Sequence, residues 1–239
     1  MLKAERIKKK FGELVAVDDL SFHVKTGQIF GIAGPNGAGK STVFNLITGI
    51  YDYEGSIEFQ GRKITGLPPH RIAQAGIART FQIPQTFPSL TVEKSISVGS
   101  RFGSKKGLNS SHVKEIIRFV GLEEVQHQRT GRLSLLGKKK LMIGAALATQ
   151  PKILMLDEPM AGSNAKEIRD LMTLIRNINE ERGVTVIIIE HFMKVLTELT
   201  ENLLILESGR MICCDIPETV TQNPKVIESY LGDAYADNK

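Results

Sequence analysis

Two short segments of this 239-residue sequence carry residues that could act on a phosphate group. The first, GPNGAGKS from Gly34 to Ser41, follows an apolar run and precedes a helical pattern. Glycines in such a loop let backbone N–H groups point at phosphate oxygens, and the helix N-terminus adds partial positive charge. Lys40 can reach the terminal phosphates, and the Ser41 hydroxyl can bind Mg²⁺. A chance glycine-rich turn is the alternative, but both flanks match the strand and helix that this chemistry requires.

The second segment, ILMLDEP, ends an apolar strand in two acids. Asp157 can hold the Mg²⁺ shell, and Glu158 stands where a general base could orient water for in-line attack on a γ-phosphate. We expect Pro159 to hold the backbone of Glu158 in an extended conformation, because the residue before a proline is restricted. Two acids after a strand often mark only a loop opening. Together with the glycine-rich loop, they predict nucleotide hydrolysis.

The elements that must position these segments alternate between strands and helices. Apolar runs bounded by turn residues predict strands, and apolar residues at helical spacing predict helices. We expect strands at 14–25, 27–34, 55–61, 152–157, 184–190 and 202–209, and helices at 39–49, 89–99, 110–122, 136–149 and 164–182, with a short helix and strand within 67–81.

This alternation predicts an α/β fold, and strands that are apolar on both faces favour buried parallel pairing. We predict one domain over residues 1–239. Its core comprises residues 1–88 and 150–239, and an inserted helical subdomain occupies about 89–149. A polar stretch, GSKKGLNSS, separates the first two helices of that subdomain.

Composition adds only weak constraints. The net charge is +5 with a pI of about 9.1, which suits phosphates, an anionic membrane or nucleic acid but also an ordinary solvated surface. The two cysteines, Cys213 and Cys214, are adjacent and cannot form a disulfide framework, so we expect a reducing compartment and place them in a terminal strand. No apolar run reaches the roughly 18 residues that span a bilayer, so we expect a soluble chain.

With these motifs in place, the sequence resembles the ATP-binding subunits of ABC transporters over nearly its whole length. More narrowly, it is similar to the ATPases of branched-chain (hydrophobic) amino-acid importers. The resemblance implies a P-loop NTPase fold of the ABC ATPase type, with a mainly parallel core, an antiparallel β part and an inserted helical subdomain. It rests on FGELVAVDDLSF, GPNGAGKSTVFNLITGIY, ITGLPPHRIAQAGIARTFQ, FPSLTVEKSISVG, ALATQPKILMLDEPMAG, IIIEH and NPKVIESYLG.

The resemblance also implies roles for single residues, most of which would pass for core or loop positions if met alone. Phe11 falls where an aromatic ring stacks on adenine, and Ala16 where a small side chain packs near the nucleoside. Gln82 falls at the glutamine that touches Mg²⁺ and the attacking water, and His191 at the histidine that bonds the γ-phosphate. Phe87 is a candidate contact to a membrane subunit. ATP would be held by Phe11, Ala16, Gly34, Pro35, Asn36, Gly37, Ala38, Gly39, Lys40, Ser41, Thr42, Ser134 and Gly137, and Mg²⁺ by Ser41, Gln82 and Asp157.

Family members carry Leu-Ser-Gly-Gly-Gln where this chain has LSLLG, counted without gaps from Asp157. The motif opens a helix and contacts the γ-phosphate of ATP on a second subunit. Ser134 keeps its hydroxyl, whereas Leu136 places a side chain where a glycine allows close backbone approach. A one-residue slip that brings Gly137 to the glycine position is the alternative alignment. In the next loop Asn164 replaces the family's aspartate, and Asn164 with Glu167 forms a predicted helix-capping pair.

Lys138, Lys139 and Lys140 follow this motif directly. Three cations in the first turns of a helix oppose its dipole by about 0.3–1 kcal/mol each when exposed. The simplest interpretation is a solvated basic face. The alternative hypothesis is that these charges face the triphosphate of the second subunit, which would offset the cost.

The resemblance predicts an ATPase that drives an importer for branched-chain or other hydrophobic amino acids. It implies a second ATPase subunit, identical or homologous, membrane-spanning permease subunits and, indirectly, a substrate-binding protein. It places the chain in the cytoplasm, on the inner face of the cell membrane. Two other functions stay open: a non-transport ABC ATPase acting on nucleic acid or the ribosome, and a regulatory subunit with little hydrolysis. The first usually needs two ATPase halves or a long coiled coil, so we expect no nucleic-acid partner.

Overall fold

The computed structural model describes residues 1–103 and 110–229. The chain forms two compact units, one of Met1–Pro69 with Thr185–Lys239 and one of His70–Val184. Most of the polar stretch GSKKGLNSS, at 104–109, and the end of NPKVIESYLG, from residue 230, lie outside the described residues. The subdomain boundaries at 89 and 149 stay a prediction.

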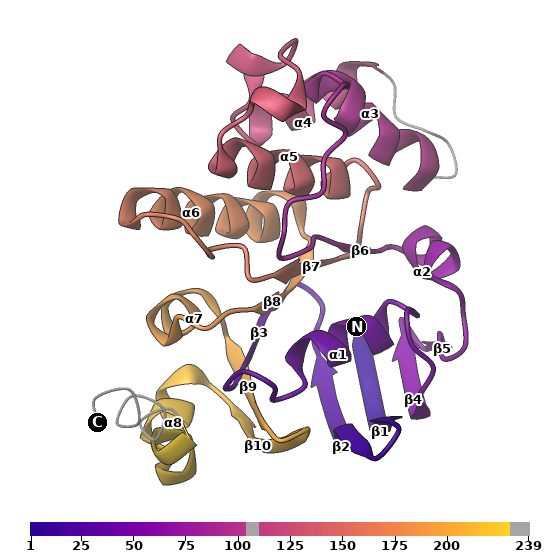
Figure 1. Cartoon of the computed structure of the whole chain (residues 1–239), viewed down its shortest axis with the longest axis vertical. Coiled ribbons are helices and arrows are strands. Elements are labelled where there is room, and N and C mark those ends of the chain that lie inside the picture. Colours follow the sequence, from indigo (N-terminus) through magenta and orange to yellow (C-terminus); the bar gives the residue numbers. More distant parts are fainter. Residues whose placement is uncertain (104–109, 230–239) are drawn as a thin grey trace. The chain divides into compact units, whose positions relative to one another are not determined.

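The first unit contains an antiparallel sheet, which confirms the antiparallel part of the expected fold (Figure 1). The sequence predicts two of its strands and misses the first, because charged residues interrupt the apolar alternation there. A bulge in this strand places Arg6 at a positive φ of 46°, and an added Cβ on the facing Gly55 would lie 2.3 Å from the Arg6 carbonyl oxygen. The strand order is β2 (Leu14–Val24), β1 (Leu2–Phe11), β4 (Glu54–Phe59) and β5 (Arg62–Lys63).

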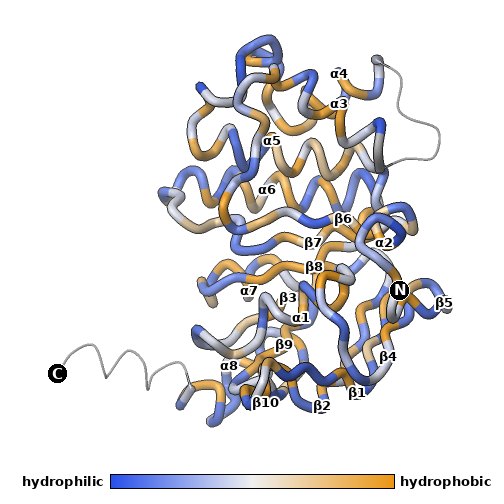
Figure 2. The backbone as a smooth tube through the Cα atoms, turned by 45° about the vertical axis from the view of Figure 1, so that its right-hand side comes forward, coloured by the Kyte–Doolittle hydropathy of each residue, from blue (hydrophilic) through white to orange (hydrophobic). Residues whose placement is uncertain are grey.

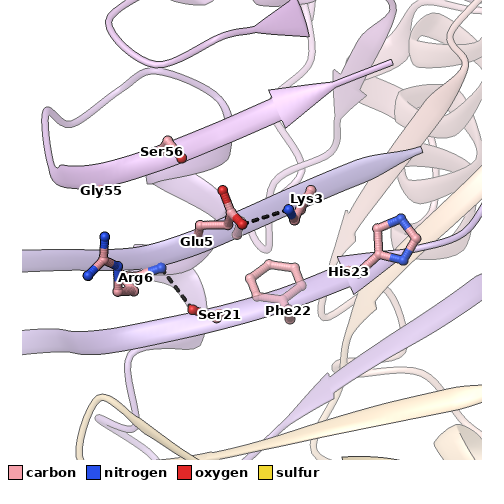
Figure 3. A pocket seen from close by; sticks show the side chains of 9 residues that line it. Lys3, Glu5, Arg6, Ser21, Phe22, His23, Gly55 and Ser56 are labelled. Atoms are coloured by element: carbon pink, nitrogen blue, oxygen red, sulfur yellow. Dashed lines mark hydrogen bonds and ion pairs between the residues drawn. The ribbon is translucent and has the colours of Figure 1, made fainter. Parts of the chain in front are cut away.

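A hollow on this sheet is lined by residues of β1, β2 and β4 (Figure 3). Within it, the Lys3 ammonium lies 2.6 Å from the Glu5 carboxylate, and the Arg6 backbone N–H donates to the Ser21 hydroxyl. Lys3 and Glu5 are both about half exposed, so water screens the charge that they present. We assign this hollow no ligand.

The first unit also holds the predicted parallel strands. β3 pairs in parallel with both β8 and β9, and β10 closes the edge in antiparallel orientation. Every residue of β3 and β8 is buried, as two-sided apolar strands require, and β9 is mostly orange in the hydropathy colouring of Figure 2. Cys213 and Cys214 lie in β10, as predicted. The strands are β3 (Ile29–Ala33), β8 (Thr185–Ile189), β9 (Asn202–Glu207) and β10 (Arg210–Asp215), and the helices are α1 (Lys40–Ile47), α7 (Met193–Leu199) and α8 (Pro217–Gln222).

The second unit combines one parallel strand pair with a group of helices, which confirms the helices predicted from spacing. Asn164 and Glu167 form the predicted capping box, and Gly183 ends the same helix in the left-handed region. The strands are β6 (Ile77–Arg79) and β7 (Ile153–Asp157), and the helices are α2 (Pro69–Ala75), α3 (Val92–Gly103), α4 (Ser110–Phe119), α5 (Leu135–Leu147) and α6 (Ala165–Arg182), with single 3₁₀ turns at Glu123–Val125 and Thr130–Arg132. Among the described residues, no helix is both long and apolar enough to cross a bilayer.

Helices α3 and α5 approach each other through a glycine. An added Cβ on Gly99 would lie 2.1 Å from the Ala145 carbonyl oxygen, which belongs to the backbone of α5 and cannot rotate away. On α5, Gly144 similarly faces the side chains of Ile96 and Val120 at 3.2 and 3.3 Å. The position of α5, which carries the LSLLG segment at its start, therefore depends on close backbone packing against α3.

We predict that Gly99→Ala lowers the free energy of unfolding by about 1–3 kcal/mol, because overpacking must push the two helices apart. Urea unfolding followed by circular dichroism measures this. Lys94→Ala on the exposed face of α3 is the control and is expected to stay within about 0.5 kcal/mol of wild type. Equal stability of the two variants would contradict the close approach.

Candidate active site

The loop Gly34–Ser41 joins β3 to α1 and has a backbone that only glycine permits at two positions. Gly34 has a φ of +148°, and a Cβ there would lie 2.1 Å from the Leu206 carbonyl oxygen. Gly39, the N-cap of α1, has a φ of +99°, and its Cβ would lie 2.4 Å from the Ala16 carbonyl oxygen. The N–H groups of this turn and of α1 form a cradle that fits an anionic phosphate chain.

Lys40 and Ser41 begin the helix that follows the cradle. The Lys40 side chain is buried, and its ammonium donates to the carbonyl oxygens of Gly34 at 2.7 Å and Pro35 at 2.9 Å. The ammonium therefore lies inside the curve of the loop, where it can exchange these carbonyls for phosphate oxygens. Ser41 is exposed at the mouth of the same turn.

The turn between β9 and β10 braces this loop, which the sequence does not predict. The Gly209 N–H donates to the Ala38 carbonyl at 3.1 Å, and its own carbonyl accepts from the Asp18 N–H at 2.8 Å. The Arg210 guanidinium donates twice to the Asp18 carboxylate, at 3.0 and 2.7 Å. Hydrogen bonds from Lys8 and then Arg210 lower the pKa of that carboxyl group. Hydrogen bonds thus connect Asp18 of β2 to the turn at Gly209 and Arg210, and connect that turn to Ala38 of the glycine-rich loop.

Phe11 and Ala16 lie in the same unit. The Phe11 ring is 41% exposed at the end of β1 and packs nearly perpendicular to the Tyr51 ring, with 5.1 Å between ring centroids. The Lys9 ammonium lies over the Phe11 ring, 5.2 Å from its centroid. The exposed part of the ring keeps area for a flat ligand. Ala16 is half-buried, and its carbonyl borders Gly39 as described above.

His191 follows β8, the parallel neighbour of β3. Ile32 pairs with Ile189 across these strands, so the segments after both strands leave the same edge of the sheet. The Glu190 N–H reaches the Ile32 carbonyl at 3.4 Å, and the His191 N–H donates to the buried Glu190 carboxylate at 3.2 Å. The structure therefore brings His191 to the edge that carries the glycine-rich loop.

In the second unit, β6 and β7 pair in parallel, and their ends bring together an ion pair that the sequence does not predict. The Arg79 guanidinium lies 2.6 Å from one oxygen of Asp157, and the two side chains are only 8% and 6% exposed. The other oxygen, Asp157 Oδ1, is buried and accepts no hydrogen bond from the described residues. A buried carboxylate oxygen of this kind fits a ligand to Mg²⁺, the hard cation that oxygen donors prefer.

Glu158 is 9% exposed and accepts a hydrogen bond from the amide of Gln82 at 2.5 Å. Its φ is +47°, so the expectation of an extended backbone before Pro159 is wrong. A non-glycine residue in the left-handed region costs of order 1–3 kcal/mol, and it persists where the surroundings determine the conformation. Here the buried strand β7 precedes the residue, its backbone carbonyl accepts from the Ala161 N–H at 3.2 Å, and its carboxylate accepts from Gln82.

The LSLLG segment contains the start of α5, which begins at Leu135, and the choice between the alignment without gaps and the one-residue slip stays a prediction. Ser134 is the N-cap, and its hydroxyl oxygen accepts from the Gly137 N–H at 3.1 Å. Gly137 is buried, and an added Cβ would lie 3.3 Å from Leu133 Cβ. The contact of Ser134 and Gly137 with nucleotide stays a prediction.

The three lysines that follow do not share one face. Lys139 is only 3% exposed and donates to the Ser163 hydroxyl at 2.8 Å and to the Ala161 carbonyl. A Cβ on Gly121 would lie 3.4 Å from the Lys140 ammonium. Both hypotheses are therefore wrong for Lys139: it is neither solvated nor directed away from its own subunit.

Each unit thus gathers one set of the predicted residues. Sequence patterns do not identify Arg79, Tyr51 or the Asp18–Arg210 pair, and they do not predict that Lys139 is buried. Arg79 had a signal, since it stands in the strand that leads to Gln82, next to a second strand that ends in two acids. The first unit holds Phe11, Ala16, Gly34–Thr42 and His191, and the second holds Gln82, Ser134, Gly137, Asp157 and Glu158.

Comparison with known proteins matches two family models to the chain. The ABC transporter model matches residues 17–161, and the model for branched-chain amino acid ATP-binding cassette transporters matches residues 210–236. The chain is 34% identical to the high-affinity branched-chain amino acid transport ATP-binding protein BraF of Pseudomonas aeruginosa, over 98% of each chain.

Two solved structures resemble the fold over nearly the whole chain. One is the ADP conformation of an ATP-binding cassette of an ABC transporter, with a TM-score of 0.88, 31% identity and coverage of 97% of this chain and 98% of that one. The other is a dimeric bacterial ABC transporter cassette, with a TM-score of 0.81, 25% identity and coverage of 91% and 99%.

We predict that Arg79→Met lowers the free energy of unfolding by about 3–5 kcal/mol, because it leaves the Asp157 carboxylate buried without its cation. The double variant Arg79→Met/Asp157→Leu is expected to regain most of this loss, since an apolar pair needs no charge compensation. Urea unfolding of the single and double variants measures both effects. A double variant less stable than Arg79→Met would show that the two side chains do not compensate each other.

Proposed function

The chain belongs to the ABC transporter family, and from this premise we propose that it is the ATP-hydrolysing subunit of an importer for branched-chain or other hydrophobic amino acids. The chain is 34% identical to BraF across 98% of both chains, which supports membership of the family and ATPase activity. The match of residues 210–236 to the branched-chain model supports the cargo class. Membrane-spanning subunits and a substrate-binding protein complete the proposed system, with this chain on the inner face of the membrane.

The observation that carries the proposal is the loop Gly34–Ser41, whose backbone admits only glycine at Gly34 and Gly39 and whose turn holds the buried Lys40 ammonium. We assign the triphosphate to the N–H groups of this loop and to Lys40. Phe11 stacks on the adenine, with Ala16 beside the nucleoside, and His191 bonds the γ-phosphate from the neighbouring strand end.

Glu158 is the proposed general base. Its carboxylate accepts a proton from the attacking water while Gln82, already bonded to it, orients that water. Ser41, Gln82 and Asp157 would hold Mg²⁺, which withdraws negative charge from the β- and γ-phosphates when bound. The buried ion pair with Arg79 fixes the rotamer of Asp157 so that Oδ1 can reach the cation.

A second ATPase subunit completes each site in this proposal. Ser134 and the N-terminal amides of α5 would meet the γ-phosphate bound by the partner subunit, since a helix N-terminus attracts anions. The dimeric cassette among the similar structures supports pairing with a second subunit. Phe87, which is 54% exposed after β6, is the proposed contact to a membrane-spanning subunit.

We predict that Glu158→Gln lowers kcat by at least about 100-fold, because general-base catalysis contributes that much or more. It should also trap a dimer with ATP and Mg²⁺, which light scattering reports as a doubled molar mass. Adding Ser134→Arg to this variant should return the mass to that of a monomer. A dimer that survives Ser134→Arg would contradict the role of Ser134.

Further measurements separate the alternatives. A chain that stays monomeric at saturating ATP, and dimerises only when a homologous ATPase is added, supports a mixed pair. A chain that dimerises when only the membrane subunits are added supports an identical pair. Binding of ATP without turnover by the wild-type chain in the assembled complex supports a regulatory subunit.

We predict that Phe11→Ala raises the KM for ATP by about 5- to 150-fold, the range of 1–3 kcal/mol that stacking of one base on an aromatic ring contributes. The kcat should change less, because the ring does not touch the reacting atoms. Leu14→Ala is the matched control, since Leu14 is 66% exposed on the same hairpin. Steady-state hydrolysis against ATP concentration tests both. An unchanged KM in Phe11→Ala would place the adenine elsewhere.

A further inference from the structure

Lys139 is a buried cation whose partners identify what it does. It lies in the second turn of α5 and is 3% exposed. Lysine is almost never buried to this degree unless it is paired, because removing an ammonium from water is costly. Its ammonium donates hydrogen bonds to the Ala161 carbonyl and to the Ser163 hydroxyl, which lie 22 and 24 residues further along the chain. The side chain therefore ties α5 to the loop between β7 and α6.

That loop has little regular structure of its own. It begins at Glu158, in the left-handed region, and passes through Gly162 at a φ of +71°. Its backbone bonds are short-range, from Ala161 N–H to the Glu158 carbonyl at 3.2 Å and from Ser163 N–H to the Met160 carbonyl at 3.0 Å. Burial of Met160 holds the start of the loop, and the hydrogen bonds from Lys139 hold its second half at Ala161 and Ser163.

A second contact joins the same two segments. A Cβ on Gly162 would lie 3.2 Å from Cδ2 of Leu135, so the Leu135 side chain reaches over the loop from the first turn of α5. Leu135 occupies the third position of LSLLG, where the general family has glycine. Lys139 also lines a small cavity together with Gln82 and Glu158. The lysine therefore bonds to the loop after Glu158 and borders the same cavity as the Glu158 side chain.

We propose that Lys139 is a positioning residue that couples the N-terminus of α5, with Ser134, to the segment that carries Glu158. This rests on the proposed function, in which Ser134 meets the nucleotide of the partner subunit. A shift of α5 on that nucleotide would pull on Ala161 and Ser163 and so set the direction of the Glu158 carboxylate. Each subunit then aligns its own base only when it also holds the partner's ATP.

Lys139→Met tests this, because methionine keeps the length and the apolar stem of the side chain but donates nothing. We expect kcat to fall by about 10- to 100-fold, since small misplacement of a catalytic group costs up to about 100-fold. The KM for ATP should stay within about twofold, because the nucleotide cradle lies on other residues. Lys114→Met removes an exposed charge from α4 of the same unit and should leave kcat unchanged.

Ser163→Ala removes one acceptor without touching α5 and should lower kcat by a smaller factor. The double variant Lys139→Met/Ser163→Ala should be no slower than Lys139→Met, because residues that act through one contact are not additive. A purely structural role would change the unfolding midpoint with normal kcat at temperatures well below it. If Lys139→Met does not fold, Ser163→Ala and its effect on kcat still decide the matter.

Two results would overturn the proposal while leaving the function intact: wild-type turnover in Lys139→Met or Ser163→Ala, or independent multiplication of their effects in the double variant. Failure of the proposed function looks different, because the wild-type chain would then hydrolyse no ATP, or would hydrolyse it without assembling with membrane-spanning subunits.

Discussion

Parallel pairing of short buried strands is the constraint on which this protein depends. Strands that run the same way end at the same edge, and the segments that follow them emerge together. β3 and β8 bring the glycine-rich loop and His191 to one such edge. β6 and β7 do the same for Gln82 and the two acids. The chemistry therefore sits where the hydrogen-bonded ladder stops and backbone groups become available to a ligand.

Two kinds of interaction hold the segments that follow these strands in place. In the first unit, the backbone provides them: Gly209 bonds to Ala38, and glycines allow atoms to approach within distances that no side chain would permit. In the second unit, buried charges provide them, with Arg79 on Asp157 and Lys139 on the loop after Glu158. The backbone supports hold the shape of the loop that we propose binds phosphate. The buried charges hold Asp157 and the loop after Glu158, the proposed general base.

Much of this could be predicted from sequence, for identifiable reasons. Apolar runs long enough to be two-sided revealed β7, β8 and β9, and helical spacing revealed α3 to α6. The strand β1 escaped because lysines occupy its solvent face and a bulge at Arg6 breaks its alternation. The buried lysine escaped because it sits among two others, and only tertiary contacts distinguish Lys139 from its neighbours. The conformation of Glu158 was not predicted, because the buried strand before it and the hydrogen bonds to its carbonyl and carboxylate override the local preference before proline.

The left-handed backbone at Glu158 affects which substitutions at this position would stabilise the protein. Glycine would adopt this conformation without strain, and asparagine with less strain than glutamate. Variants selected only for heat resistance would therefore include replacements of Glu158, and each of these would be a more stable protein without its proposed general base. The chain holds glutamate at a position where folding alone would choose otherwise, so its melting temperature and its usefulness to a cell are set by opposing demands on the same peptide unit.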